Sequence, residues 1–244
     1  MTPMLTNLHA FAGWKQSPCI TPQTTEIPSA DWVMIDHESE DEAIGNSDEQ
    51  AIGRAFGYIQ AIRKATKAKL GWYGWPYPNN EDDIPRLAQA FDALLLEADW
   101  IAPCCYATGD GRAFDRAKLC RSCLQWAGAS KKPCIGVVCP GLLNSERIAT
   151  DAEIAEQVHA ARTVGASSIY VWSSMGYHVW AATTNVGSGH DAFQPMHHSR
   201  AILMGKWGFS VPAWTPDAVG LEYRNKSRDI LTAFARAWRK ETRK

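Results

Sequence analysis

Five apolar runs alternate with segments of helical pattern, and this alternation constrains the fold more than any other feature of the sequence. The runs lie at residues 31–36, 69–77, 99–106, 132–140 and 167–174, and the helical patterns lie at 49–67, 83–97, 114–127 and 151–164. Continuous apolar strands separated by amphipathic helices are typical of a parallel sheet that helices cover on both faces. The sequence therefore predicts an α/β fold.

The turns after these runs restrict the kind of parallel sheet. None of the five runs is followed by the glycine-rich turn that binds a dinucleotide phosphate, which disfavours a dinucleotide-binding sheet. We therefore predict one domain over residues 1–244 with the architecture of a (β/α) TIM-type barrel. Five strands are fewer than the eight of a complete barrel, so we expect a distorted or incomplete one. Residues 1–30 can hold one or more further strands, and the segment 176–216, rich in Gly, His and Trp, can supply irregular closure.

Several helix ends are marked in the sequence. Asp83 lies two residues before Pro85, and Thr150 or Asp151 can cap a helix that has acids in its first turn. The basic segment 224–244 is also predicted to be helical, because its apolar residues recur at helical spacing. We expect this segment to form an outer helix of the barrel.

Net charge and hydropathy exclude several kinds of partner. The formal net charge is -1, which gives no electrostatic reason to expect nucleic acid. The N-terminus lacks a basic stretch followed by an apolar core, and no segment reaches the roughly 18 apolar residues of a membrane span. We expect no signal peptide and no membrane partner. This pattern fits a protein made in the cytoplasm, or a component of a phage or virion.

The seven cysteines are expected to be thiols, because their number is odd and no signal peptide is recognised. Cys120 and Cys123 have the spacing of metal ligands, which makes a zinc site the alternative. They fall in a helical segment, however, and most of the others fall on apolar runs, where Cys packs as a small apolar residue. His197 and His198 are a weak metal signal in a segment expected to be irregular. We favour structural cysteines over a metal site.

The first apolar run ends in two acids, Asp36 and Glu38. Alternate side chains of a strand face the same way, so the two acids share one face and His37 lies on the other. Catalytic groups of barrels lie at the carboxyl ends of strands, where this pair is expected. Neighbouring carboxylates resist ionising together, so one can keep its proton and act as a general acid on a glycosidic oxygen. The alternatives are a solvated acidic loop and, with less support, a divalent-cation site.

Aromatic residues recur near the ends of the other runs. They are Trp72, Tyr73, Trp75, Tyr106 and Trp172. Any one of them can be a core residue, but several at equivalent strand ends would converge on one mouth and form a cleft with stacking faces. We take Tyr73, Trp75, Tyr106 and Trp172 as candidate sugar-binding residues.

Four motifs occur in the order found in the hyaluronidase family of glycoside hydrolases. The stretch VMIDHE at 33–38 resembles that family's VIDWE strand end, and GWYGWP at 71–76 resembles its GYYGFP. PCCY at 103–106 is similar to its PS-x-Y, and SIYVWSS at 168–174 is similar to its VVLWGS. The chain thus resembles a distant, short relative of this family.

The resemblance implies a retaining, substrate-assisted glycosidase in a distorted barrel of about seven strands, acting on a polysaccharide that contains N-acetylhexosamine. Glu38 matches the family's proton donor, and Asp36 matches the carboxylate that orients the acetamido group of the substrate. Tyr106 matches a tyrosine that hydrogen-bonds this acetamide, Trp172 matches a tryptophan of the same pocket, and Tyr73 would border it. The resemblance implies no metal ion and no organic cofactor.

The chain departs from the family pattern at three places, which keep two alternatives open. His37 replaces a tryptophan between the acids, SEDE at 39–42 removes an arginine, and residues 137–139 stand where the family has a tyrosine. One alternative is a lysozyme-type peptidoglycan muramidase that uses the same two acids, which the DWIA stretch at 99–102 also fits. The other is a catalytically inactive carbohydrate-binding or structural module.

Overall fold

The strands of this protein are short and the helices long. The computed structural model describes residues 8–9, 19–20, 31–36, 49–74, 78, 80–107, 109, 111–141, 147–173, 175–183 and 193–243. The strands are β1 (Leu8–His9), β2 (Cys19–Ile20), β3 (Trp32–Ile35), β4 (Lys69–Tyr73), β5 (Trp100–Ala102), β6 (Ile135–Val138) and β7 (Ser168–Val171). The helices are α2 (Glu49–Ala65), the 3-10 helix η1 (Glu81–Asp83), α3 (Ile84–Glu97), α4 (Ala113–Trp126), α5 (Asp151–Thr163), α6 (Met175–Thr183), α7 (Phe193–Gly205) and α8 (Pro216–Glu241).

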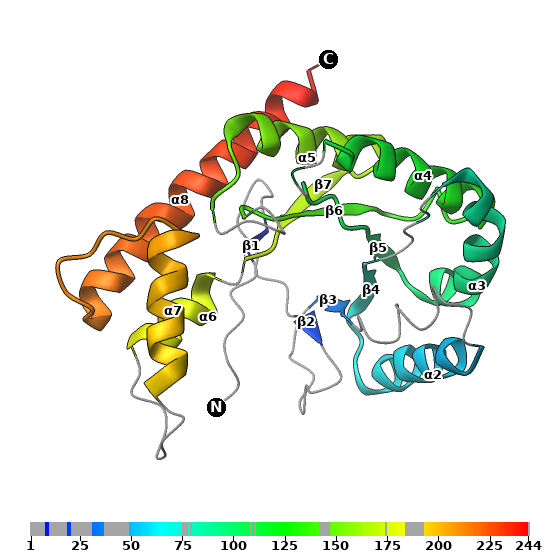
Figure 1. The fold of residues 1–244 in the computed structure, drawn as a ribbon. Helices are drawn as coiled ribbons and strands as arrows, with labels where there is room; N and C mark the ends of the chain where they lie inside the picture. Colours follow the sequence, from blue (N-terminus) through cyan, green and yellow to red (C-terminus); the bar gives the residue numbers. More distant parts are fainter. Residues whose placement is uncertain are drawn as a thin grey trace.

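The strands follow one another in a single row. β2, β3, β4 and β5 are parallel neighbours, and Ile35 of β3 lies opposite Trp72 of β4. β6 and β7 are parallel to each other, and β1 pairs with β7 in the antiparallel direction. A parallel bridge between Ile101 and Cys134 links β5 to β6. The helices α2, α3, α4, α5 and α8 lie in an arc outside this row (Figure 1).

The predicted α/β architecture with parallel strands is confirmed, and residues 1–30 contain strands as expected. A closed barrel is not seen among the described residues, where β1 pairs with β7, β2 pairs with β3, and β1 and β2 do not pair with each other. Two features account for this difference. An antiparallel β1 departs from the all-parallel pattern of a barrel, and strands of two residues offer few backbone groups for pairing.

The segment 176–216, which we considered as irregular closure, contains most of α6 and all of α7, and its residues 184–192 lie outside the described residues. α6 and α7 pack against each other, and His178 Nδ1 lies 3.2 Å from the Ser199 hydroxyl. Such tertiary packing stabilises helices that the pattern of a Gly- and His-rich sequence does not predict. His197 and His198 therefore occupy exposed positions on α7.

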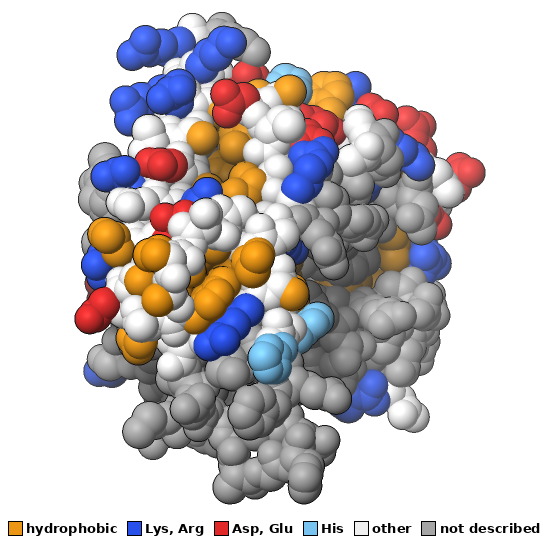
Figure 2. All heavy atoms as spheres, turned by 60° about the vertical axis from the view of Figure 1, so that its left-hand side comes forward, with side chains coloured by type: hydrophobic (Ala, Val, Ile, Leu, Met, Phe, Trp, Pro, Cys, Tyr) orange, Lys and Arg blue, Asp and Glu red, His pale blue; other side chains and the backbone are white. Residues whose placement is uncertain are grey.

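The predicted C-terminal helix is confirmed and begins earlier than expected, at Pro216. Its apolar face, with Ile230, Leu231 and Phe234, is buried, and Glu241 bonds His159 of α5 at 2.6 Å. Lys and Arg side chains gather at the top of the face drawn in Figure 2, the end at which the chain terminates in Figure 1. Of the helices that are described, none is long and apolar enough to cross a membrane.

The helix start at Thr150 is built as the sequence predicts. The Thr150 hydroxyl accepts a hydrogen bond from the Glu153 N–H, and the Glu153 carboxylate accepts one from the Thr150 N–H at 2.7 Å. This reciprocal pair satisfies two donors at the start of α5. α3 likewise begins next to Asp83 with Pro85 in its first turn.

The strands separate two hydrophobic cores, because alternate side chains of a strand face opposite sides. The outer core lies between strands and helices and includes Val33, Ile35, Leu70 and Trp72. The inner core lies on the other side of the strands and consists of Met34, Tyr73, Trp100, Ala102, Tyr106, Ile135, Val137, Cys139 and Tyr170. A side chain that contributes to a site enclosed by the strands must therefore belong to the inner face.

The amino-terminal half of the inner core is filled by one indole. Trp100 is 0% exposed and its Nε1 donates to the Lys69 carbonyl oxygen at 3.3 Å. Gly71 of the neighbouring strand makes room for the ring, because a Cβ at this position would lie 2.0 Å from the Trp100 ring. The interior is thus packed at this end of the strands.

Of the six cysteines whose side chains the structure describes, five are buried, and no disulfide joins the six. Burial raises the pKa of the Cys123 and Cys134 thiols to about 12 and that of Cys139 to about 11. The prediction that these cysteines fill the core is confirmed. Over the described part of the chain, no group of three or more His, Cys, Asp or Glu side chains could hold a metal ion.

Candidate functional site

Three aromatic side chains from the carboxyl ends of different strands meet on the inner face. Tyr73 is the last residue of β4, Tyr106 follows β5, and Trp172 directly follows β7. The Tyr73 and Tyr106 hydroxyl oxygens are 2.9 Å apart. The Tyr106 and Trp172 rings are stacked, with centroids 6.2 Å apart and planes inclined by 26°. We call these three side chains the aromatic cluster.

Strand alternation decides which aromatic residues join this cluster. Trp72 and Tyr73 are neighbours in β4, yet Trp72 belongs to the outer core and Tyr73 to the inner core. Tyr106 and Trp172 have the same inward orientation, because both contact the inner core. Trp72, which the sequence also offered as an aromatic residue at a strand end, therefore faces the helices and lies away from the site.

The aromatic cluster offers hydrogen bonds without charge. Burial raises the pKa of Tyr106 well above its ordinary value, with smaller contributions from Cys104 and Tyr73, so its phenol is neutral. In the hydroxyl pair one phenol donates to the other. Arg116 of α4 holds this part of the chain by donating from Nη2 to the Tyr106 carbonyl oxygen at 3.3 Å.

Asp36 lies at the same level of the sheet as Tyr73. Ile35 and Trp72 are paired in the parallel register of β3 and β4; Asp36 directly follows β3, and Tyr73 is the last residue of β4. Met34 belongs to the inner core, and Asp36 shares its parity along the strand. Asp36 is half-buried, and its Oδ1 atom is shielded from solvent. Alternation along the chain therefore predicts that the carboxylate faces the same side of the sheet as the aromatic cluster.

Two of the predicted site residues, Glu38 and Trp75, lie outside the described residues. Glu38 is two positions beyond Asp36 in the sequence, and Trp75 is two positions beyond Tyr73. Their assignment remains a prediction from the sequence.

Two residues near the cluster were not selected from the sequence as site residues. Cys104 packs against the inner core beside Tyr106, although its sequence context indicated only structural filler. Gln157 of α5 is 0% exposed, and its amide accepts from the Cys139 N–H at 2.8 Å and donates to the Cys139 carbonyl at 2.9 Å. This bond pair fixes the carboxyl end of β6. The sequence could have indicated that Gln157 is buried, since this residue interrupts the apolar stripe of α5 that includes Ile154.

The arrangement combines three kinds of contact on one side of the sheet. It offers a stacking face from Trp172, neutral hydroxyl groups from Tyr73 and Tyr106, and a carboxylate from Asp36. Rings of this kind pack against the apolar faces of flat ligands, while hydroxyl groups fix their orientation.

Comparisons with known proteins identify no family. No family model matches the sequence, and no curated protein matches it. Among solved structures, the chain is similar to bee venom hyaluronidase, at 14% sequence identity and a TM-score of 0.46. The similarity covers 72% of this chain and 69% of that chain. Both the identity and the TM-score are too low to assign the chain to a family.

Proposed function

We propose that the chain is a glycoside hydrolase that cleaves a polysaccharide containing N-acetylhexosamine, with Glu38 as acid/base and Asp36 as its partner. The observation that carries this proposal is the contact of Tyr73, Tyr106 and Trp172 at the carboxyl ends of strands, on the face to which Asp36 belongs. We also propose that the row of strands is an incomplete (β/α) barrel of seven strands, in which the carboxyl ends of the six parallel strands form the mouth of the site.

The aromatic cluster suits a sugar better than a charged or purely apolar ligand. A pyranose ring has an apolar face that packs on an indole, and its hydroxyl and acetamido groups exchange hydrogen bonds with neutral phenols. Trp75 would add a further ring beside Tyr73.

The two acids supply the chemistry in this proposal. The acetamido oxygen of the substrate attacks the anomeric carbon while Glu38 gives its proton to the leaving glycosidic oxygen. Asp36 accepts a hydrogen bond from the acetamido N–H and so orients the attacking oxygen. Glu38, now a carboxylate, then takes a proton from the water that opens the cyclic intermediate, and the configuration at the anomeric carbon is retained.

Hydrolysis assays on four polymers test the proposal. Purified protein is incubated with hyaluronan, chondroitin, chitin and peptidoglycan, and reducing ends are measured for the parent and for Glu38→Gln. We expect at least one polymer to be cleaved, and we expect Glu38→Gln to lower the rate about 10²- to 10⁴-fold. Asp92→Asn, which removes a carboxylate from an exposed position on α3, is the matched control.

The outcomes separate the alternatives. Equal release by the parent and by Glu38→Gln would remove the role of Glu38. Cleavage of peptidoglycan alone would favour the muramidase. Glycan binding without turnover, retained in the double variant Asp36→Asn and Glu38→Gln, would favour a carbohydrate-binding module.

A further inference from the structure

Cys104 lies on the wall of the candidate site. It stands two residues after Ala102 and two before Tyr106, and both of these side chains belong to the inner core. A parallel bridge to Val137 of β6 fixes its backbone, and the Cys105 N–H donates to the Val137 carbonyl at 2.7 Å. The Cys104 side chain is therefore held on the inner face, level with the start of the aromatic cluster.

The exposure of Cys104 distinguishes it from the other thiols. Of the six cysteines whose side chains are described, Cys104 alone is partly exposed. Its neighbour Cys105 is 4% exposed and belongs to the outer core. Two adjacent cysteines thus face opposite sides of the sheet, and the inward one is the less buried residue of the two.

The Cys104 sulfur is connected to the aromatic cluster by hydrogen bonds. The backbone N–H of Tyr106 and the side chain of Tyr73 both lie within hydrogen-bonding reach of it. Tyr73 is also bonded to the Tyr106 hydroxyl at 2.9 Å. The thiol and the two phenols therefore form one group of connected side chains, which we call the neutral wall.

The neutral wall carries no charge at neutral pH. Burial raises the pKa of the Cys104 thiol to about 12, and burial also raises the pKa of Tyr106. A thiol with such a pKa is a poor nucleophile, because the thiolate is the reactive form. Cys104 can instead contact a ligand as a small, polarisable group beside two hydroxyls.

We propose that Cys104 is a specificity-determining residue of the site and contacts an uncharged part of the bound sugar. This inference rests on the proposed function, since it assumes that a sugar occupies the site. An uncharged substituent loses little hydration against the neutral wall and gains contact with the sulfur. A negative charge introduced at this position would lose its hydration when the sugar binds. The uncharged part of the sugar would bring no opposite charge to compensate for this loss, so binding would be weaker.

Binding measurements on variants of the full-length chain test the proposal. The probes are chitin and hyaluronan oligosaccharides, and the readouts are Kd, KM and kcat. Cys104→Ser is expected to bind within about threefold of the parent, because it keeps a small neutral donor. Cys104→Asp, of similar size but charged, is expected to bind at least about tenfold more weakly with a raised KM. Cys105→Ser, on the opposite face, is expected to leave Kd unchanged.

A labelling experiment on the parent protein keeps the test decisive if Cys104→Asp does not fold. Prolonged reaction with N-ethylmaleimide is mapped by mass spectrometry with and without saturating oligosaccharide. We expect Cys104 to be modified before the five buried cysteines, and we expect bound sugar to slow its modification. If sugar binds but neither the Cys104→Asp affinity nor the labelling rate changes, the inference fails and the proposed function stands. If no probe binds at all, both fail.

Discussion

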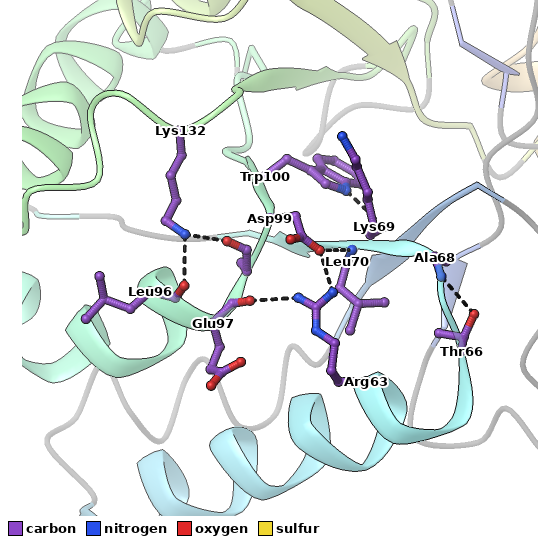
Figure 3. Close-up of polar contacts among 11 residues, drawn as sticks. Arg63, Thr66, Ala68, Lys69, Leu70, Leu96, Glu97, Asp99, Trp100 and Lys132 are labelled. Carbon is purple, nitrogen blue, oxygen red and sulfur yellow. Dashed lines mark hydrogen bonds and ion pairs between the residues drawn. The ribbon is translucent and has the colours of Figure 1, made fainter.

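The amino and carboxyl ends of the parallel strands use polar side chains in different ways. At the amino ends, Asp99 Oδ2 accepts from Arg63 Nη1 at 2.6 Å and from the Leu70 N–H at 2.8 Å (Figure 3). At the carboxyl ends, Tyr73 and Tyr106 bond each other through neutral hydroxyls, 2.9 Å apart. The first arrangement pairs charges within the protein, whereas the second leaves neutral groups beside a carboxylate.

A second cation completes the amino-end network. Lys132 Nζ donates to the carbonyl oxygens of Leu96 and Ala98, at and just after the end of α3 (Figure 3). Arg63 Nη2 donates to the Glu97 carbonyl oxygen at 2.9 Å. Cations at the end of a helix satisfy its last carbonyls and interact favourably with its dipole. The amino end is therefore arranged for stability.

This difference between the ends follows a general property of barrels. Active sites lie at the carboxyl ends of strands, and the amino ends contribute mainly to stability. Substitutions at the two ends should therefore affect different measurements, namely the free energy of unfolding at one end and sugar binding at the other.

The largest effect on stability is expected from Asp99→Asn. The variant loses the charge that pairs with Arg63, and it weakens the bond to the Leu70 N–H. Both charged side chains are more than a third exposed, so water replaces part of the interaction, and we expect a loss of about 1–2 kcal/mol in the free energy of unfolding. Denaturant titration measures this loss. Sugar affinity should stay at the parent value, and a variant with normal stability but weak binding would reverse the roles of the two ends.

The contribution of Asp99 should also depend on acid pH. Burial acts to raise the pKa of Asp99, but hydrogen bonds from Leu70 and Arg63 outweigh it and hold the pKa below 3.8. A lowered pKa in the folded state gives stability that is present above the ordinary value and is lost as the pH falls through the folded value. The difference between parent and Asp99→Asn should be full above about pH 4 and should shrink below it. A constant difference down to pH 2 would contradict this.

The sequence predicted those parts of the structure that have long, regular patterns. β3 and β4 lie within the runs predicted at 31–36 and 69–77, and α5 matches the helix predicted over 151–164, because burial on one face leaves a clear period. The direction of β1 was not predictable, since two residues carry no period. α6 was missed because its stability comes from contact with α7.

The candidate site was predictable to the same degree. Strand ends were recognised, so the proximity of Tyr73 and Tyr106 followed from the parallel arrangement of strands. The side that each residue faces depends on register, and this separates Tyr73 from Trp72 and Cys104 from Cys105. Where two neighbouring residues are chemically similar, the sequence does not show which of them faces the inner side of the sheet.

A smaller effect on stability, with a measurable effect on binding, is expected from Tyr106→Phe. The variant removes one hydroxyl of the pair with Tyr73, so we expect a loss of about 0.5–1 kcal/mol in the free energy of unfolding. If Tyr106 also bonds the sugar, Kd or KM should rise about 2- to 10-fold. Tyr58→Phe on α2, which packs on the outer core, is the control that should leave binding unchanged. Equal binding by both variants would remove the carboxyl-end cluster from the site.

The smallest effect is expected from His178→Asn in α6, the helix that follows the carboxyl end of β7. It concerns the pH dependence of Tm, which should differ between the two ends of the strands. The pKa of His178 is lowered below 6.5 by burial first and then by electrostatic contributions from His198 and Lys206. A base with a lowered folded pKa stabilises the fold fully above its ordinary value, and this stability is lost as the pH falls through the folded value. The Tm of the parent should therefore fall between pH 7 and pH 5 slightly more than that of His178→Asn, and His197→Asn on the exposed face of α7 should behave as the parent. Identical Tm profiles for parent and His178→Asn would mean that His178 titrates normally in the folded protein. His178 would then give the carboxyl side no pH-dependent stability near neutrality, in contrast to the pH-dependent stability that Asp99 gives the amino side in acid.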